Sequence, residues 1–169
     1  STLLNRLTDA GILAENKLFA TLDPTTRKLA LPGGEEVLLT DTVGFIRKLP
    51  HQLIEAFHST LEEARYADLI LHVVDASSPE ADTQMAVVYE TLRELEALEE
   101  HSIIAVYNKT DLPGAETLPK DIHAAASVRI SAATGEGLET LKELISAEKK
   151  KSRRAFEALF PYAAAGSIQ

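Results

Sequence analysis

The amino-acid sequence predicts an α/β fold, in which helices cover both faces of a doubly wound, mostly parallel sheet. Apolar runs of strand length alternate along the chain with segments whose apolar residues recur at helical spacing, as in proteins built from strand-helix-strand units. Two of these runs, residues 69–74 and 103–107, are apolar almost throughout, which is typical of strands buried on both faces. The length of 169 residues suffices for one compact domain.

The first part of the chain predicts a helix, a hairpin and a second helix. Residues 3–7 carry leucine at three- and four-residue spacing, which predicts an opening helix that ends at Gly11. Residues 29–41 place apolar runs on either side of a Pro-Gly-Gly turn, and therefore predict a β-hairpin that ends at Asp41. Residues 51–65 have the spacing of an amphipathic helix.

The second part predicts further strands and helices. Ser78 is placed to cap a helix that continues to Leu95, with Pro79 in the first helical position. After the strand at 103–107, residues 128–130 predict a short strand, and residues 138–145 predict a closing helix.

The chain divides into three expected segments. Residues 1–148 form the main domain, residues 149–155 a basic, solvated linker, and residues 156–169 the start of a further domain. The linker contains the run KKKSRR, which is able to touch RNA phosphates but is more typical of a solvated connection. Because the sequence begins at Ser1 without an initiator methionine, we expect it to be an internal segment of a longer chain.

Composition excludes several classes of function. Lys and Arg number 17 and Asp and Glu 26, a formal net charge of −9, which argues against broad electrostatic binding of DNA or RNA. The sequence has no cysteine, which excludes disulfides and thiolate zinc sites. No apolar run approaches the roughly 18 residues that span a bilayer. We therefore expect a cytoplasmic protein without stable membrane insertion.

A polar residue follows each predicted strand. These residues are Asp41, Asp75, Asn108 and Ser131. In an open parallel sheet the carboxyl ends of the strands line the ligand crevice, so the coincidence predicts a binding site at this edge. The alternative is that such residues are ordinary turn formers and caps, and it is favoured for Asp75, which precedes a Ser-Ser-Pro sequence.

The most specific motif is Asn-Lys-Thr-Asp at residues 108–111. A carboxylate at Asp111 can accept the ring N–H and the exocyclic amine of guanine side by side, whereas adenine offers no such pair of donors. Asn108 is expected to brace the loop and approach the base carbonyl, and the Lys109 stem to cover the base. Residues 131–133 (Ser-Ala-Ala) follow the next strand and are placed to offer backbone N–H groups to the same carbonyl.

A second group of residues has the chemistry of a magnesium and phosphate site. Asp41 can hold magnesium through a water, and Gly44 lets a backbone N–H approach a terminal phosphate. Thr25, which we expect in an irregular loop before the hairpin, is placed to direct its hydroxyl to magnesium. The alternative for this loop is a plain Asp-Pro turn.

In this order, the motifs DPTTR, DTVG, NKTD and SAA resemble the switch loop, the magnesium and γ-phosphate motif, the guanine motif and the base loop of Ras-like P-loop GTPases of the translation-factor class. The resemblance covers residue 1 to about residue 145. More narrowly, ATLDPTTR and DTVGFIRKLPHQLIEAFHSTLEEA resemble the HflX family of ribosome-associated GTPases.

The resemblance implies an enzyme that hydrolyses GTP to GDP and phosphate with Mg²⁺, and that acts as a switch on the ribosome, on its large subunit. An Era- or Obg-like ribosome-assembly GTPase is the alternative within the class. A non-hydrolysing interaction module is the alternative outside it.

The resemblance also assigns roles to individual residues. Ser1 and Thr25 hold magnesium directly and Asp41 holds it through water, while Gly44 and Thr25 serve catalysis. The implied nucleotide-binding residues are Ser1, Thr2, Asp41, Gly44, Asn108, Lys109, Asp111, Ser131, Ala132 and Ala133.

Two departures from the family pattern matter. The sequence begins at the last residue of the phosphate motif, Ser1, so that the glycine-rich loop, its lysine and the preceding central strand are absent from it. We therefore expect weak nucleotide binding by these residues alone. Phe45 stands where Ras-like proteins carry the glutamine that orients the attacking water, which implies slow hydrolysis that either a partner or a backbone rearrangement completes.

Overall fold

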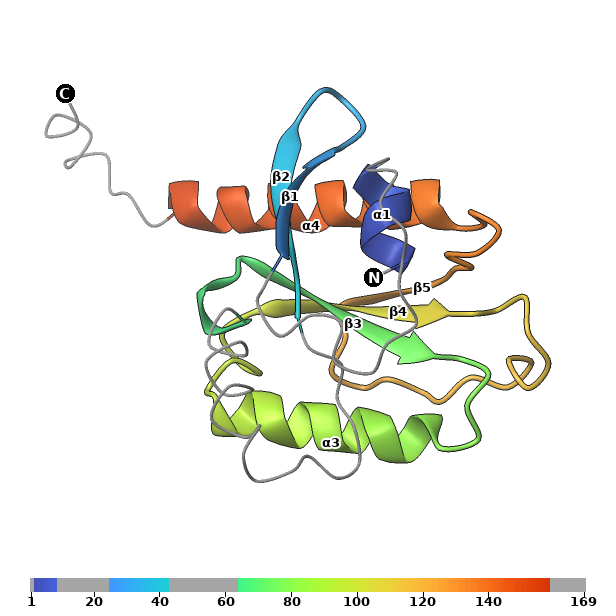
Figure 1. The fold of residues 1–169 in the computed structure, drawn as a ribbon. Coiled ribbons are helices and arrows are strands. Elements are labelled where there is room, and N and C mark those ends of the chain that lie inside the picture. The colour runs from blue at the N-terminus through green and yellow to red at the C-terminus, as the bar shows by residue number, and fades with distance from the viewer. Residues whose placement is uncertain (1, 9–24, 43–63, 159–169) are drawn as a thin grey trace, which may run out of the picture.

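The computed structural model describes residues 2–8, 25–42 and 64–158. Within them, strands β3, β4 and β5 form a parallel sheet in that order, and β1 and β2 form an antiparallel hairpin (Figure 1). The predicted α/β fold is thereby confirmed. The elements are α1 (Thr2–Thr8), β1 (Thr25–Ala30), β2 (Glu36–Asp41), β3 (Leu69–Asp75), α3 (Ala81–Glu94), β4 (Ser102–Asn108), β5 (Ala126–Arg129) and α4 (Leu138–Ala158).

The parallel sheet separates two helical layers, with α3 on one side and α1 and α4 on the other (Figure 1). Successive residues of β4 alternate between the two layers, because side chains of a strand point to opposite faces. Ile104 and Val106 belong to the core that contains α1 and α4. Ile103, Ala105 and Tyr107 belong to the core that contains α3. Burial on both faces explains why this strand is a continuous apolar run.

The register of the hairpin follows its hydrophobic pattern. Leu29 lies opposite Val37, and both pack into the core beside α1 and α4. One residue earlier in β1, Lys28 lies opposite Leu38, which is 70% exposed. Because a one-residue slip would exchange these two faces, burial fixes the register. The hairpin ends at Asp41, as the sequence predicts.

Within the described residues the hairpin forms no ladder with the parallel sheet. It is held to the α4 side by its apolar face and by Lys149 of α4. The ammonium of Lys149 donates to the carbonyl oxygen of Glu36 at 3.2 Å and lies 3.5 Å from the carboxylate of Glu35. Packing thus places the end of the hairpin, where Thr25 and Asp41 lie, relative to the rest of the domain.

The position of Thr25 differs from the prediction. The sequence places Thr25 in an irregular loop, whereas in the structure it is the first residue of β1 and pairs with Asp41. Threonine is β-branched and favours extended backbone. The hydroxyls of Thr26 and Thr40 also lie 2.9 Å apart across the two strands. This cross-strand contact stabilises the end of the ladder next to the pair of Thr25 and Asp41.

The start of α3 also differs from the prediction. The helix begins at Ala81, and Ser78 is not its cap. The hydroxyl of Ser78 accepts a hydrogen bond from the N–H of Glu80 at 3.2 Å, and the N–H of Ser78 donates to the carbonyl of Asp75 at 3.2 Å. The residues after β3 therefore form consecutive turns before the helix, because Ser and Asp side chains stabilise turns as readily as caps.

The predicted linker is helical. Helix α4 continues through residues 149–155 to Ala158. Lys and Glu are good helix formers, and Lys151 donates to the carboxylate of Glu148 at 2.6 Å on the same helix. The hydrogen bonds from Lys151 and Ser102 hold the pKa of Glu148 below its ordinary value. Where the domain ends stays a prediction.

Several predicted features lie outside the described residues. They include Ser1, Gly11, Gly44 and Phe45, and most of the helix expected over residues 51–65, of which residues 64 and 65 are described and helical. None of the helices in the described part of the chain is both long and apolar enough to cross a membrane.

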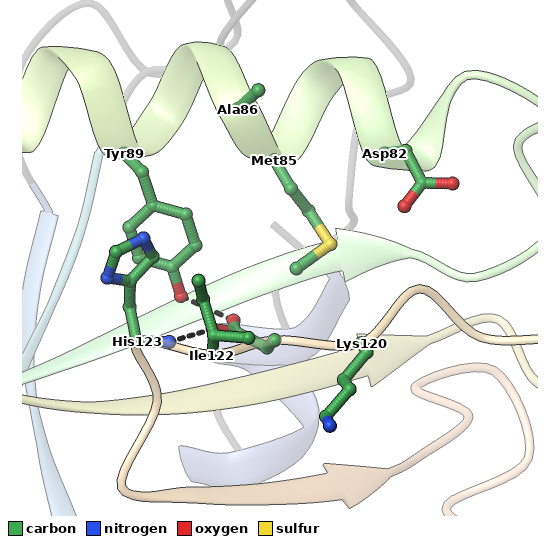
Figure 2. Close-up of a pocket in the computed structure, with 8 residues that line it drawn as sticks. Asp82, Met85, Ala86, Tyr89, Lys120, Ile122 and His123 are labelled. Carbon is green, nitrogen blue, oxygen red and sulfur yellow. Dashed lines mark hydrogen bonds between the residues drawn. The ribbon is translucent and has the colours of Figure 1, made fainter.

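A polar cluster lies between the sheet and α3. A cavity of about 150 Å³ opens between α3 and residues 120–123 (Figure 2). At its side, the Tyr89 hydroxyl donates to the carboxylate of Asp121. The ring of His72 meets that of Tyr89 edge-on, with centroids 4.9 Å apart. His72 is buried, and burial lowers its pKa to about 4 although the charge of Asp121 opposes the shift.

Replacing His72 with Phe tests this burial. His72 takes up a proton near pH 6.5 in the unfolded chain but only near pH 4 in the folded protein, because burial lowers its pKa. The stabilising effect of neutral His72 is therefore complete above pH 6.5 and is lost as the pH falls towards 4. We expect the free energy of unfolding of the wild type to fall over this window by up to about 1.4 kcal/mol per pH unit more than that of His72→Phe. Denaturant unfolding at pH 5 and pH 7 measures the difference, with the less buried His101→Gln as control. Equal slopes in wild type and His72→Phe would contradict the expectation.

Candidate functional site

The polar residues predicted at the strand ends lie at one edge of the parallel sheet. Asp75 and Asn108 are the last residues of β3 and β4 and are direct partners in the ladder. Ser131 follows the end of β5 by two residues. Because the three strands are parallel, these residues lie at the same edge of the sheet, which is the edge at which open α/β sheets bind their ligands.

The loops after β4 and β5 are joined by side-chain hydrogen bonds. The side-chain oxygen of Asn108 accepts from the backbone N–H groups of Lys109, at 2.8 Å, and of Ala132, at 2.9 Å. The Ser131 hydroxyl donates to the carboxylate of Asp111 at 2.7 Å. The Thr110 hydroxyl donates to the carbonyl of residue 130 at 2.8 Å. The motif at 108–111 and the loop at 131–133 therefore form one unit.

Lys109 has an unusual backbone conformation at the centre of this unit. Its φ is 64°, in the left-handed region that costs a residue other than glycine about 1 kcal/mol or more and that clusters at binding sites. The side chain of Asn108 stabilises the turn by accepting the N–H of Lys109. The Lys109 ammonium then reaches across to Asp75, to which it donates at 2.7 Å.

Asp75 combines a turn role with this ion pair. Its other carboxylate oxygen accepts from the N–H of Ser77 at 3.0 Å and from the Ser77 hydroxyl at 2.6 Å, which agrees with the turn interpretation of the sequence. Burial raises the pKa of Asp75, but hydrogen bonds from Lys109 and Ser77 outweigh it, so that the pKa lies below its ordinary value. Both partners of the ion pair are partly exposed, and its value is therefore in the range of about 0–1 kcal/mol.

The Asp111 side chain is exposed, but a buried residue orients its carboxylate. The Ser131 hydroxyl donates to one oxygen of the Asp111 carboxylate, and Ser131 is completely buried. The Ser131 hydroxyl also accepts from the N–H of Thr134 at 3.1 Å, so its direction is fixed. A carboxylate held in this way presents an acceptor edge to a ligand, and such an edge suits two parallel N–H donors.

A glycine allows the loop after β5 to fold back on the strand. Gly137 has a φ of 75°, and a Cβ added there would lie 2.2 Å from the carbonyl oxygen of Arg129. Any other residue would push the start of α4 away from β5. The N–H of Gly135 donates to the carbonyl of Ser131 at 2.8 Å, which closes the loop that holds residues 131–133.

One contact to this loop was not predicted from the sequence. Arg6 on α1 donates from Nε to the carbonyl of Ala132 at 3.0 Å and from a terminal nitrogen to the carbonyl of Ala133. The residues are more than 120 positions apart, and nothing in the sequence pattern signals the pairing. Thr2, which the sequence predicts as a site residue, is the first residue of α1 and is exposed.

The end of the hairpin carries two of the predicted magnesium ligands. Thr25 and Asp41 lie directly opposite each other in the ladder, and Asp41 is half-buried. A hydroxyl and a carboxylate are oxygen donors of the kind that Mg²⁺ prefers, and Mg²⁺ usually takes only one or two carboxylates besides phosphates and waters. The described residues contain no cluster of three His, Cys, Asp or Glu side chains able to hold a metal without such help.

The family assignment agrees with this geometry. A family model described as a 50S ribosome-binding GTPase matches residues 1–109. The chain belongs to this family, and its fold is that of a P-loop GTPase domain.

The relatives narrow the family further. The chain is 61% identical over 169 residues to the protein named GTPase HflX of Lacrimispora saccharolytica, covering all of this chain and 40% of that protein. It is 54% identical over 166 residues to GTPase HflX of Caldanaerobacter subterraneus subsp. tengcongensis, covering 96% of this chain and 37% of that protein. The predicted resemblance to the HflX family is thereby confirmed. The chain spans about two fifths of the length of these relatives.

Solved structures share the fold. A crystal structure of SsGBP in complex with GDP is 26% identical, with a TM-score of 0.68, over 90% of this chain and 47% of that one. A mutation variant of SsGBP is 24% identical, with a TM-score of 0.69, over 90% of this chain and 52% of that one, and shows the likeness of fold alone.

Asn108→Ala tests whether one side chain joins the two loops. The substitution leaves the N–H groups of Lys109 and Ala132 without their acceptor, and Ala132 is buried. We expect the free energy of unfolding to fall by about 1–3 kcal/mol, as for a buried donor left unsatisfied. Asn108→Asp keeps an acceptor oxygen and is expected to lose less. Urea unfolding of both variants measures the costs, and equal costs would argue against the acceptor role.

Proposed function

We propose that this chain is the nucleotide-binding part of a GTPase that hydrolyses GTP to GDP and phosphate and acts as a switch on the ribosome. The observation that carries the proposal is the joined pair of loops at the ends of β4 and β5, in which Asn108 accepts from Ala132 and Ser131 donates to Asp111. Such an arrangement brings an oriented carboxylate and the backbone of residues 131–133 to one place, which suits the donors and the carbonyl of a guanine edge.

Each residue of the pair of loops has a distinct role in base binding. The Asp111 carboxylate accepts the ring N–H and the exocyclic amine of guanine, and Ser131 fixes its direction. The N–H groups of Ala132 and Ala133 lie in the loop that would meet the base carbonyl, and Asn108 already holds the first of them. The methylene stem of Lys109 covers the base while its ammonium stays paired with Asp75.

We place the phosphates and magnesium at the end of the hairpin and at the start of α1. Ser1 and Thr25 would bind Mg²⁺ directly and Asp41 through a water, and Thr2 would lie beside the phosphates. Magnesium supplies positive charge to the phosphate oxygens. Gly44 would leave room for its own N–H to donate to the γ-phosphate.

Hydrolysis would be slow without help. Phosphoryl transfer to water needs a group that orients the water, and Phe45, which stands in that position of the family pattern, has no polar atom to do so. The large ribosomal subunit is the partner proposed to complete the reaction, and the cytoplasm is the compartment in which it would be met. The net charge of −9 implies that affinity for RNA comes from other parts of the whole protein.

Asp111→Asn is the test of guanine recognition. The substitution replaces an acceptor oxygen with an amide donor, so the variant in the whole protein that contains this chain should bind GDP about ten- to a hundredfold more weakly. It should prefer xanthosine diphosphate, whose carbonyl replaces the amine of guanine. The exposed Asp68→Asn is the control. Equal affinity of the wild type for ADP and GDP would overturn the assignment.

Steady-state phosphate release with and without purified large subunits tests the partner. We expect the subunits to raise the GTPase rate of the whole protein at least tenfold, which is about 1.4 kcal/mol of barrier. Phe45→Gln without subunits should not reproduce the gain, because a glutamine helps only where the surrounding loop already places it. An unchanged rate at saturating subunit concentration would remove the ribosome from the proposal.

A further inference from the structure

The guanidinium of Arg6 bridges two successive carbonyls of the loop after β5. Its Nε donates to Ala132 at 3.0 Å, and a terminal nitrogen donates to Ala133. Arg6 belongs to α1, the helix that begins at Thr2. The Arg6 side chain therefore connects two parts of the proposed site. One is α1, whose start we place near the phosphates, and the other is the loop at residues 131–133, which we place near the base.

These two bonds determine where the loop directs its N–H groups. A peptide unit is planar and trans, so its N–H points opposite to its carbonyl. Holding the carbonyl of Ala132 towards α1 turns the N–H of Ala133 away from α1. Holding the carbonyl of Ala133 does the same for the N–H of Thr134, which indeed donates to the Ser131 hydroxyl at 3.1 Å.

The N–H groups of the loop are thus oriented by two distant side chains. Asn108 accepts the N–H of Ala132, and Arg6 sets the peptide plane that carries the N–H of Ala133. Among the described residues, the N–H of Ala133 donates to no protein acceptor. It is therefore the loop donor that is available to a ligand acceptor.

We propose that Arg6 is a positioning residue for base recognition: it orients the backbone of Ala132 and Ala133 so that the loop donates to the carbonyl of guanine. The inference rests on the proposed function and adds to it a residue outside the base motifs. It also gives α1 a direct mechanical link to the base loop, so that displacement of one moves the other.

The chemistry of arginine suits this role better than that of lysine. A guanidinium is a rigid planar fork with five donors and can serve two neighbouring carbonyls at once. An ammonium on a flexible stem can replace one of the two bonds. Arg6→Lys is therefore expected to fall between the wild type and Arg6→Ala, which removes both.

Comparison of GDP with two analogues distinguishes the contact to the base carbonyl from the contact to Asp111. In 6-thio-GDP a sulfur, which is a weaker acceptor, replaces the carbonyl oxygen. In IDP the carbonyl is kept and the exocyclic amine that Asp111 accepts is missing. The ratios of the dissociation constants of 6-thio-GDP and of IDP to that of GDP therefore report the two contacts separately.

The experiment uses the whole protein that contains this chain. Arg6→Ala is expected to weaken GDP binding about three- to tenfold, in line with the loss of one well-aligned hydrogen bond. Its 6-thio-GDP ratio should fall towards one, while its IDP ratio stays at the wild-type value. The exposed Arg93→Ala on α3 is the matched control and should change neither ratio.

Amide hydrogen exchange of the nucleotide-free protein provides a second measurement. Arg6→Ala should speed exchange of the amides at 132–134, as expected for a loop that has lost its anchor. Unchanged exchange there, or a 6-thio-GDP ratio equal to that of the wild type, would overturn the inference. A wild type that does not prefer GDP to ADP would instead overturn the proposed function, and the exchange result would still show whether Arg6 holds the loop.

Discussion

The parallel pairing of β4 with β3 and β5 is the constraint on which the rest of the molecule depends. The pairing places Asn108 directly beside Asp75 and brings the end of β5 to the same edge. It also requires β4 to be buried on both faces, which its alternating contributions to the two cores satisfy. A shift of β4 by one residue would exchange the two faces and move Asn108 away from the loop that it holds.

The exposed residues of the site owe their geometry to buried ones. Asp111 is exposed and Ser131, which donates to it, is fully buried, so the direction of the carboxylate proposed to bind the base is set inside the protein. Asn108, which is partly buried, in turn accepts from the backbone N–H of the buried Ala132 and so joins the two loops. Such an arrangement reduces the conformational entropy that a binding event would cost, because the groups proposed to contact the ligand are ordered beforehand.

Local patterns in the sequence predicted most of the fold, and competition between local structures explains the errors. The hairpin and its end at Asp41 follow from alternation and turn residues, and the buried strands follow from their apolar runs. The cap assigned to Ser78 is wrong because Asp75 and Ser78 use their hydrogen bonds in consecutive turns. Residues 149–155, which we predicted as a linker, are helical because their basic residues are also good helix formers, and the domain boundary there stays a prediction.

The site shows the same distinction between short-range and long-range information. Asn108, Lys109 and Asp111 stand in one short motif that the sequence displays, whereas the ion pair of Lys109 with Asp75 joins residues 34 positions apart. The contact of Arg6 with Ala132 joins residues 126 positions apart, and only the packing of α1 against the α4 side of the sheet creates it. A motif therefore identifies the groups that meet a ligand, and the tertiary structure determines which other residues hold them. Arg6 and Asp75 are residues of this second kind, since their hydrogen bonds connect elements that no motif joins.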